Sequence, residues 1–266
     1  IHNEASNFSV GANIAYLLVP AYLHLGFVIR FLAGLGQRSY QALKYAPFPV
    51  VGAPSGMALG GGCEVLLHCD AVQAHGETYM GLVEAAVGLI PGWGGCTEML
   101  GRWQADKKLP GGPMPPVAKV FETVSMATVA KSAMEAKDHL FLLDRDAITM
   151  NRNRVLADAK AKALELADGY GPPERIEMNL PGASALAAMR MAIRDFRKRG
   201  IATPHDATVA EGLAGVLSGG KTDITETMDG NDILKLEREG FARLALLGKT
   251  KARIRHMLMK GKPLRN

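Results

Sequence analysis

Three consecutive glycines stand directly before a glutamate in the stretch SGMALGGGCEVLLHCD, residues 55–70. The apolar run after Gly60, Gly61 and Gly62 predicts a helix, so these glycines form a turn at its start. Such a turn presents free backbone N–H groups and the positive end of the helix dipole to the space in front of it. The stretch therefore suits an anion, either a bound phosphate or an oxyanion that develops during a reaction.

The residues after the glycines favour an oxyanion over a phosphate. Neither GxxxxGKS/T nor GxGxxG occurs here, and Cys63 and Glu64 stand where a phosphate loop has lysine and serine. A glutamate in the first helical turn would repel a phosphate, whereas a neutral carbonyl carries no charge before it reacts. The alternative is a tight turn packed against a neighbour, with Glu64 as an ordinary carboxylate at a helix N-terminus.

A second acidic residue, Glu84, lies twenty residues after Glu64 in the apolar segment MGLVEAAVGLIPGWGG. A carboxylate among Val83, Ala85 and Val87 loses hydration unless it is paired or used in a reaction. Burial would raise its pKa toward neutrality, which suits a general acid. The alternative is a carboxylate at a helix start or in a loop that points to water.

The composition is that of a globular protein. The chain has 266 residues, 48% of them hydrophobic and 21% charged, enough for one large domain or for one domain with an appendage. The net charge is +5, and basic residues gather late in the chain, in RDFRKRG (194–200) and KTKARIRHMLMKGKPLRN (249–266). No nucleic-acid-binding motif accompanies them, so we interpret them as solvated helix faces and expect no nucleic-acid partner.

Cysteine and histidine usage argues against disulfides and metals. Cys63, Cys69 and Cys96 form neither an even set nor a CxxC pair, which indicates a reducing compartment and a cytoplasmic location. No histidine stands at a spacing such as HExxH, so we expect no metal. We also expect no membrane insertion, since no signal peptide and no apolar run of about 20 residues occurs. The chain begins at Ile1 without a methionine, which suggests a fragment or a processed product.

The first part of the chain has a mixed α/β pattern. Apolar residues at helical spacing in residues 14–43, interrupted by Pro20 and Gly26, predict two helices or one broken helix. Residues 48–51 suit a short buried strand, and AVQAH (71–75) suits another after the glycine turn and its helix.

The later part of the chain has a helical pattern. LPGGPMPPVA (109–118) indicates a surface loop. From residue 119 onward nearly every segment has helical spacing, including ITMNRNRVLADAKAKALELADGY (148–170). Glycines stand where these helices would stop, at Gly169, Gly200, Gly219 and Gly248.

The segment PFPVVGAPSGMALGGGCEVLLHCDAVQAHGETYMGLVEAAVGLIPGWGGCTEML, residues 47–100, resembles the signature region of the crotonase superfamily, whose founding member is enoyl-CoA hydratase. The glycine turn, both glutamates, their spacing and the GLIPGWGG segment all agree with that family. Upstream, NFSVGANI (7–14) is similar to the family's FxAGADI element. The ending GKPLRN resembles the crotonase-like C-terminal part of large fused 3-hydroxyacyl-CoA dehydrogenase/enoyl-CoA hydratase proteins.

The resemblance implies a crotonase-like α/β fold, a spiral of ββα units followed by an all-helical C-terminal region. It places the crotonase-like core, in part, in residues 1–118 and the helical region in residues 119–266. The fold is expected to be N-terminally truncated, because crotonase domains normally have early strands and a CoA-binding segment before the FxAGADI element.

The resemblance also assigns roles to individual residues. The backbone N–H groups of Ala12 and Gly61 would form the oxyanion hole for the thioester carbonyl of an acyl-CoA. Glu64 would orient and deprotonate a water for attack at the β-carbon, and Glu84 would deliver a proton to the α-carbon. Substrate contacts are expected at Val10, Gly11, Gly60, Pro91 and Trp93.

The chain departs from the family pattern at Asn13, where aspartate is usual, and at Trp93 and Cys96, where GAGGT is common. We therefore expect a different acyl pocket or entrance. Basic residues of the later helices either meet the CoA phosphates or are solvated helix charges; they are Lys235, Arg238, Arg243, Lys249 and Lys251.

The expected function is enoyl-CoA hydratase activity in fatty-acid β-oxidation. Retention of both glutamates favours hydration, and the alternatives are enoyl-CoA isomerisation, another crotonase reaction, or a non-catalytic CoA-binding or assembly module. The resemblance implies no metal and no redox cofactor, with NAD only if a dehydrogenase domain is attached upstream. It also implies a homo-oligomer, commonly a trimer or a dimer of trimers.

Overall fold

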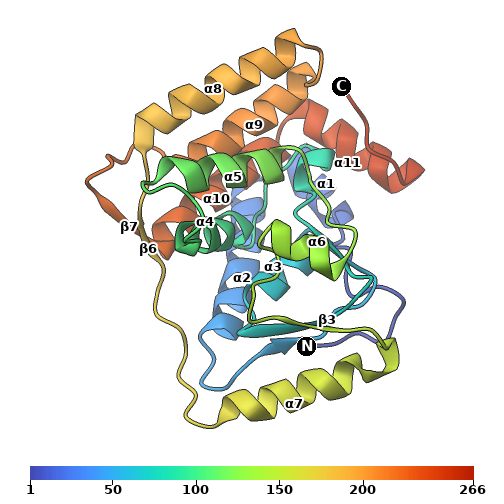
Figure 1. Ribbon diagram of the computed structural model, residues 1–266. Helices are drawn as coiled ribbons and strands as arrows, with labels where there is room; N and C mark the ends of the chain where they lie inside the picture. The colour runs from blue at the N-terminus through green and yellow to red at the C-terminus, as the bar shows by residue number, and fades with distance from the viewer.

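The computed structural model describes residues 1–266 (Figure 1). The α-helices are α1 (Ala15–Tyr22), α2 (Gly26–Lys44), α3 (Gly61–Leu67), α4 (Gly95–Ala105), α5 (Met114–Ser125), α6 (Ala133–Asp138), α7 (Val155–Ala167), α8 (Gly182–Lys198), α9 (Pro204–Leu217), α10 (Gly230–Ala245) and α11 (Gly248–Lys260). The strands are β1 (Val51–Gly52), β2 (Met57–Leu59), β3 (Ala71–His75), β4 (Tyr79–Gly81), β5 (Ala147–Thr149), β6 (Glu177–Asn179) and β7 (Thr227–Asp229). Two 3-10 helices, η1 (Glu84–Val87) and η2 (Arg152–Arg154), complete the set.

Two successive β-β-α turns form the centre of the fold. β1 and β2 lead into α3, and β3 and β4 lead through η1 into α4. β1 pairs in parallel with β3, with Val51 opposite Ala71, and β2 pairs in parallel with β4, with Met57 opposite Tyr79. Each turn of the chain therefore stacks on the one before, which confirms the expected spiral of ββα units.

The N-terminal segment forms part of a preceding turn. His2 makes a parallel bridge with Ala53, and Ser9 makes one with Ala58. The Ser9 N–H donates to the carbonyl of Met57 at 3.0 Å, and the Leu59 N–H donates back to Ser9 at 2.9 Å. These bonds bring the NFSVGANI segment against the strand that ends at the glycine turn.

Helices cover the spiral on both sides. The main hydrophobic core lies between the spiral and the helices α2, α4, α5, α8, α9 and α10. A small separate core, formed by Val51, Ala53, Ala71, Val155 and Ala159, lies between the sheet and α7. Figure 1 shows α7 alone on one side of the sheet, with the bundle of α5, α8, α9 and α10 on the other.

Several local predictions are confirmed, but the helix after the predicted loop over residues 109–118 starts earlier than expected. Residues 14–43 form two helices, α1 and α2, with the break just before Gly26. Gly200 has a φ of +70° just after α8, where a helix stop was predicted. The predicted loop over residues 109–118 is shorter than expected, because α5 starts at Met114 and Pro115 lies in its first turn. Proline is tolerated there because the first helical N–H groups have no partner in the helix.

The C-terminal region is mainly helical, as expected, and contains three short strands. β5 adds to the central sheet beside β3, with Gln73 opposite Ala147, while β6 and β7 form an antiparallel pair. The helix predicted over residues 148–170 therefore begins later, at Val155, because β5 is fixed by pairing with a distant strand. Gly248 opens α11 and does not end a helix, since α10 already stops at Ala245.

Candidate active site

The glycine turn lies directly against the NFSVGANI segment. Gly60 has a φ of +56°, in the left-handed region that favours glycine. Gly61 is the first residue of α3, where an N–H group has no partner within the helix. A methyl group on Gly61 would lie 3.7 Å from the Ala12 nitrogen, and neither of these two N–H groups donates a hydrogen bond within the protein. Two adjacent free donors are what an oxyanion hole needs.

Glu64 lies in the first turn of α3 and is only 2% exposed. Its Oε1 accepts hydrogen bonds from the backbone N–H groups of Trp93 at 2.8 Å and Gly95 at 2.9 Å. Burial raises the pKa of Glu64 from 4.5 to about 7, and the backbone donors oppose that rise because they favour the ionised form. Glu64 can therefore lose and regain a proton near neutral pH, as a general base must.

Glu84 opens η1 on the next turn of the spiral. The residue is partly exposed, but its Oε2 atom is buried and has no hydrogen-bond partner. A methyl group on Gly60 would lie 3.4 Å from its Oε1, so the carboxyl faces the glycine turn. Burial, followed by the negative charge of Glu64, raises the pKa of Glu84 well above 4.5. This direction favours the protonated form that a general acid needs.

Trp93 covers one side of the glycine turn. A methyl group on Gly61 would lie 2.8 Å from its ring, and one on Gly36 of α2 would overlap it. The Tyr40 ring meets Trp93 edge to face, with the centroids 5.4 Å apart, and the Tyr40 hydroxyl donates to the Gly61 carbonyl at 3.0 Å. Because Gly36 and Gly61 have no side chains, the Trp93 ring can pack against them. The ring narrows the space through which a ligand can reach the two free N–H groups.

The structure brings most of the predicted site residues together. A methyl group on Gly11 would lie 3.3 Å from the Gly61 nitrogen, and one on Gly95 would lie 2.9 Å from the Cβ of Pro91. Pro91 thus packs against the turn that binds Glu64. Val10 differs from the others, because 62% of it is exposed at the edge of the site.

Sequence reasoning missed Tyr40 and Glu237. Glu237 of α10 is fully buried, and its Oε1 accepts a hydrogen bond from the Gly94 N–H at 2.7 Å. Its position after Ile233 and Leu234 on the apolar face of the helix was the signal that could have found it. Tyr40 has no comparable signal in the sequence.

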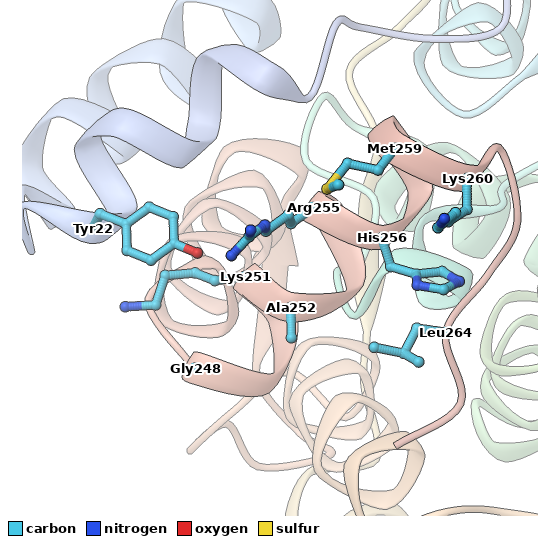
Figure 2. Close-up of a pocket in the computed structure, with 9 residues that line it drawn as sticks. All are labelled: Tyr22, Gly248, Lys251, Ala252, Arg255, His256, Met259, Lys260 and Leu264. Atoms are coloured by element: carbon cyan, nitrogen blue, oxygen red, sulfur yellow. The ribbon is translucent and has the colours of Figure 1, made fainter.

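A pocket of about 550 Å³ lies apart from the two glutamates, between α1 and α11 (Figure 2). Lys251, one of the predicted basic residues, lies there with its Nζ 5.1 Å from the centre of the Tyr22 ring. Arg255, His256 and Lys260 follow along α11. Another predicted basic residue, Arg238, lies elsewhere and donates to the side chain of Gln37 at 3.3 Å. The pocket is therefore basic, with apolar surface from the aromatic ring.

The structure contains no group of three or more His, Cys, Asp or Glu side chains placed to hold a metal ion. None of its helices combines the length and the apolar character needed to cross a membrane.

Comparison with known proteins yields a consistent set of matches. The family model described as "Enoyl-CoA hydratase/isomerase" matches residues 31–108. A "Probable 3-hydroxyacyl-CoA dehydrogenase" of Bacillus subtilis (strain 168) is 41% identical over 271 residues, which cover 100% of this chain and 34% of that protein. A "Crotonyl-CoA hydratase" of Syntrophomonas wolfei is 34% identical over 93 residues, 35% of this chain and 34% of that protein.

Solved structures share the fold. An enoyl-CoA hydratase from Bacillus halodurans superposes with a TM-score of 0.59 at 16% identity, covering 96% of this chain and 79% of that one. The chain spans about a third of the length of the Bacillus subtilis relative, so it corresponds to one part of that protein.

Proposed function

The chain belongs to the enoyl-CoA hydratase/isomerase family, the crotonase superfamily, and from this we propose that it adds water across the double bond of a 2-enoyl-CoA in fatty-acid β-oxidation. One observation carries the proposal: a buried glutamate, Glu64, and a partly exposed glutamate with one buried carboxyl oxygen, Glu84, lie beside a pair of free backbone N–H groups. Glu64 is held by backbone donors, whereas the Oε2 of Glu84 has no partner. That asymmetry gives one base and one acid, which hydration requires.

The free N–H groups of Ala12 and Gly61 would hold the thioester carbonyl oxygen. As the β-carbon is attacked, the electrons of the double bond move through the α-carbon onto that oxygen and form an enolate. Donors fixed in place before the reaction stabilise this charge, and loss of one such donor costs about 2.7–4 kcal/mol in activation energy. The Trp93 ring blocks one face of Gly61, whereas Ala12 is exposed. The thioester would therefore approach the two N–H groups from the side of Ala12.

The two glutamates would divide the proton transfers. The Glu64 carboxylate takes a proton from water while the water oxygen bonds to the β-carbon, and the Glu84 carboxylic acid gives its proton to the α-carbon as the enolate collapses. One water is thereby added, Glu64 ends protonated and Glu84 ends ionised. A proton must then return from Glu64 to Glu84 before the next cycle.

The test is an assay of crotonyl-CoA hydration, which is monitored through the loss of 2-enoyl absorbance. We expect activity in the wild type and its loss in both Glu64→Gln and Glu84→Gln, because each substitution removes one proton carrier without changing side-chain size. Glu77→Gln, at an exposed position on the same part of the chain, is the matched control and is expected to keep full activity.

Two results would replace this proposal. If only Glu84 matters and the protein moves the double bond of a 3-enoyl-CoA, the reaction is isomerisation. If the wild type binds acyl-CoA but neither hydrates nor isomerises it, the chain is a binding or assembly module.

We further propose that this unit works within a longer fused protein. The name of the Bacillus subtilis relative and the share of it that the chain spans support a 3-hydroxyacyl-CoA dehydrogenase partner domain, which would use NAD. A homo-oligomer, commonly a trimer, and a cytoplasmic location remain predictions. Sequencing the gene upstream of Ile1 tests the fusion, and sedimentation of the purified chain tests the trimer.

A further inference from the structure

A third buried carboxylate lies behind the two catalytic candidates. Glu237 reaches from α10 to the N-terminus of α4, where Gly94 occupies the capping position but has no side chain. Its Oε1 accepts from the Gly94 N–H at 2.7 Å, and its Oε2 lies 3.3 Å from the Thr97 hydroxyl and 3.4 Å from the Thr97 N–H. Glu237 thus supplies, from a distant helix, the acceptor that a capping side chain normally provides.

Three consecutive N–H groups connect this carboxylate to Glu64. The N–H groups of Trp93 and Gly95 donate to Glu64, and the N–H of Gly94 between them donates to Glu237. The turn is therefore held by hydrogen bonds to two different carboxyl groups, one on each side of it. Gly94 has a φ of +109°, a conformation that glycine adopts without the strain another residue would have.

No cation neutralises this cluster. None of the salt bridges in the protein involves Glu64, Glu84 or Glu237. The other titratable groups close to them are Tyr40 from α2, Cys63 from α3, Cys96 from α4, and His68, whose Nδ1 lies 2.7 Å from the Glu64 carbonyl oxygen. Burial lowers the pKa of His68, which disfavours its charged form. Burial and then the negative charge of Glu64 raise the pKa of Glu237 well above 4.5, which favours an uncharged Glu237 beside an ionised Glu64. Backbone donors are the groups that stabilise an ionised Glu64, so whatever holds those donors controls the base.

We propose that Glu237 is a positioning residue for the hydration reaction: it fixes the Trp93–Gly95 turn so that the backbone donors hold Glu64 in place and in its ionised form. Glu237 itself touches no reacting atom. The inference rests on the proposed function for its catalytic consequence, but the effect on Glu64 is independent of any reaction.

The experiment compares Glu237→Ala with Glu237→Gln in the full chain. The pKa of Glu64 is measured by ¹³C NMR of glutamate carboxyl carbons, with its signal identified by its absence from Glu64→Gln, and kcat and KM are measured for crotonyl-CoA. We expect Glu237→Ala to raise the Glu64 pKa and to lower kcat on the order of tenfold at neutral pH, with little change in KM, because the donors to Glu64 are loosened. Glu237→Gln keeps an amide oxygen as acceptor for Gly94 and should restore both quantities.

The controls separate positioning from folding. Glu239→Gln lies on the exposed side of the same helix and should change neither quantity. Thr97→Val removes only the hydroxyl contact with Glu237 and should raise the Glu64 pKa by a smaller amount, which keeps the test decisive if Glu237→Ala fails to fold.

An unchanged Glu64 pKa in Glu237→Ala, or in Thr97→Val where the alanine variant does not fold, overturns the inference. A wild type that lacks hydratase activity overturns the proposed function alone, because the NMR titration still decides whether Glu237 controls Glu64.

Discussion

Glu98 and Glu84 are both glutamates with buried carboxyl oxygens, yet they are held in opposite ways. Both carboxylate oxygens of Glu98 lie 2.7 Å from the Lys44 Nζ, and this pair links α4 to α2. Glu84 faces no cation, and its Oε2 has no partner at all. The ion pair compensates the burial of the Glu98 charge, whereas burial of a carboxyl without a partner costs free energy.

The same division extends to other buried charges. Arg102 donates to the carbonyl groups of Leu67, Leu140 and Phe141, and Arg253 of α11 donates to Asp206 at 2.7 Å. These groups fasten helices to the spiral and have all the partners they need. Around the glycine turn, by contrast, a buried carboxyl oxygen of Glu84 has no hydrogen-bond partner.

The largest effect is expected at Glu84, where a substitution should lower activity without lowering stability. Glu84→Gln should lower the rate of crotonyl-CoA hydration on the order of 10²–10⁴-fold, because a general acid is lost. The free energy of unfolding, measured by urea denaturation, should not fall, since the amide removes a buried carboxyl that has no partner. A loss of stability together with activity would make Glu84 a structural residue.

The opposite result is expected at Lys44. Lys44→Met leaves Glu98 buried and unpaired, so the free energy of unfolding should drop by about 3 kcal/mol, as when one partner of a buried ion pair is removed. The kcat of the folded fraction should stay as in the wild type, because neither residue contacts the glycine turn. Urea denaturation and a crotonyl-CoA assay on the same samples check both statements. A lower kcat with an unchanged free energy of unfolding would contradict the view that the Lys44–Glu98 pair stabilises the fold while the region around Glu84 serves activity.

A smaller effect concerns the pH dependence of stability. Burial gives Glu64 a pKa of about 7 in the folded protein against 4.5 in the unfolded chain. Between these values the folded protein keeps a proton that the unfolded chain releases, so the contribution is complete below about pH 4.5 and is lost as pH rises to about 7. Urea denaturation across this range should show the free energy of unfolding falling more steeply in the wild type than in Glu64→Gln. Equal slopes would contradict the assignment, and Glu77→Gln controls for the loss of one carboxyl.

The smallest effect is expected at the basic pocket on α11. Arg255→Glu with Lys260→Glu should raise the KM for crotonyl-CoA several-fold at low salt, because acyl-CoA carries phosphate groups that a basic surface attracts. At high salt the difference should disappear, since exposed charges are screened. Lys198→Glu on α8, which does not line the pocket, is the control. A KM that is the same at every salt concentration would show that this pocket does not meet the CoA phosphates.

The glycine turn and both glutamates were predictable because their signals are local. Three glycines disfavour a helix start on grounds of backbone entropy, and a carboxylate disfavours an apolar segment. Both departures from local preference can be seen without knowing the fold. Glu237 could not be placed in the same way, because its partner Gly94 lies 143 residues away. The strand β5 escaped prediction for the same reason, since three residues become a strand only through pairing with β3.

The stacking of β1 on β3 and of β2 on β4 has a consequence for how this site can be inherited. Glu64 and Glu84 lie on consecutive turns, so the pitch of the backbone sets their separation. Ala12, with Val10 and Gly11, comes from the turn before. Polypeptide added beyond either end of such a unit leaves that pitch unchanged, which makes the site portable between proteins of very different length.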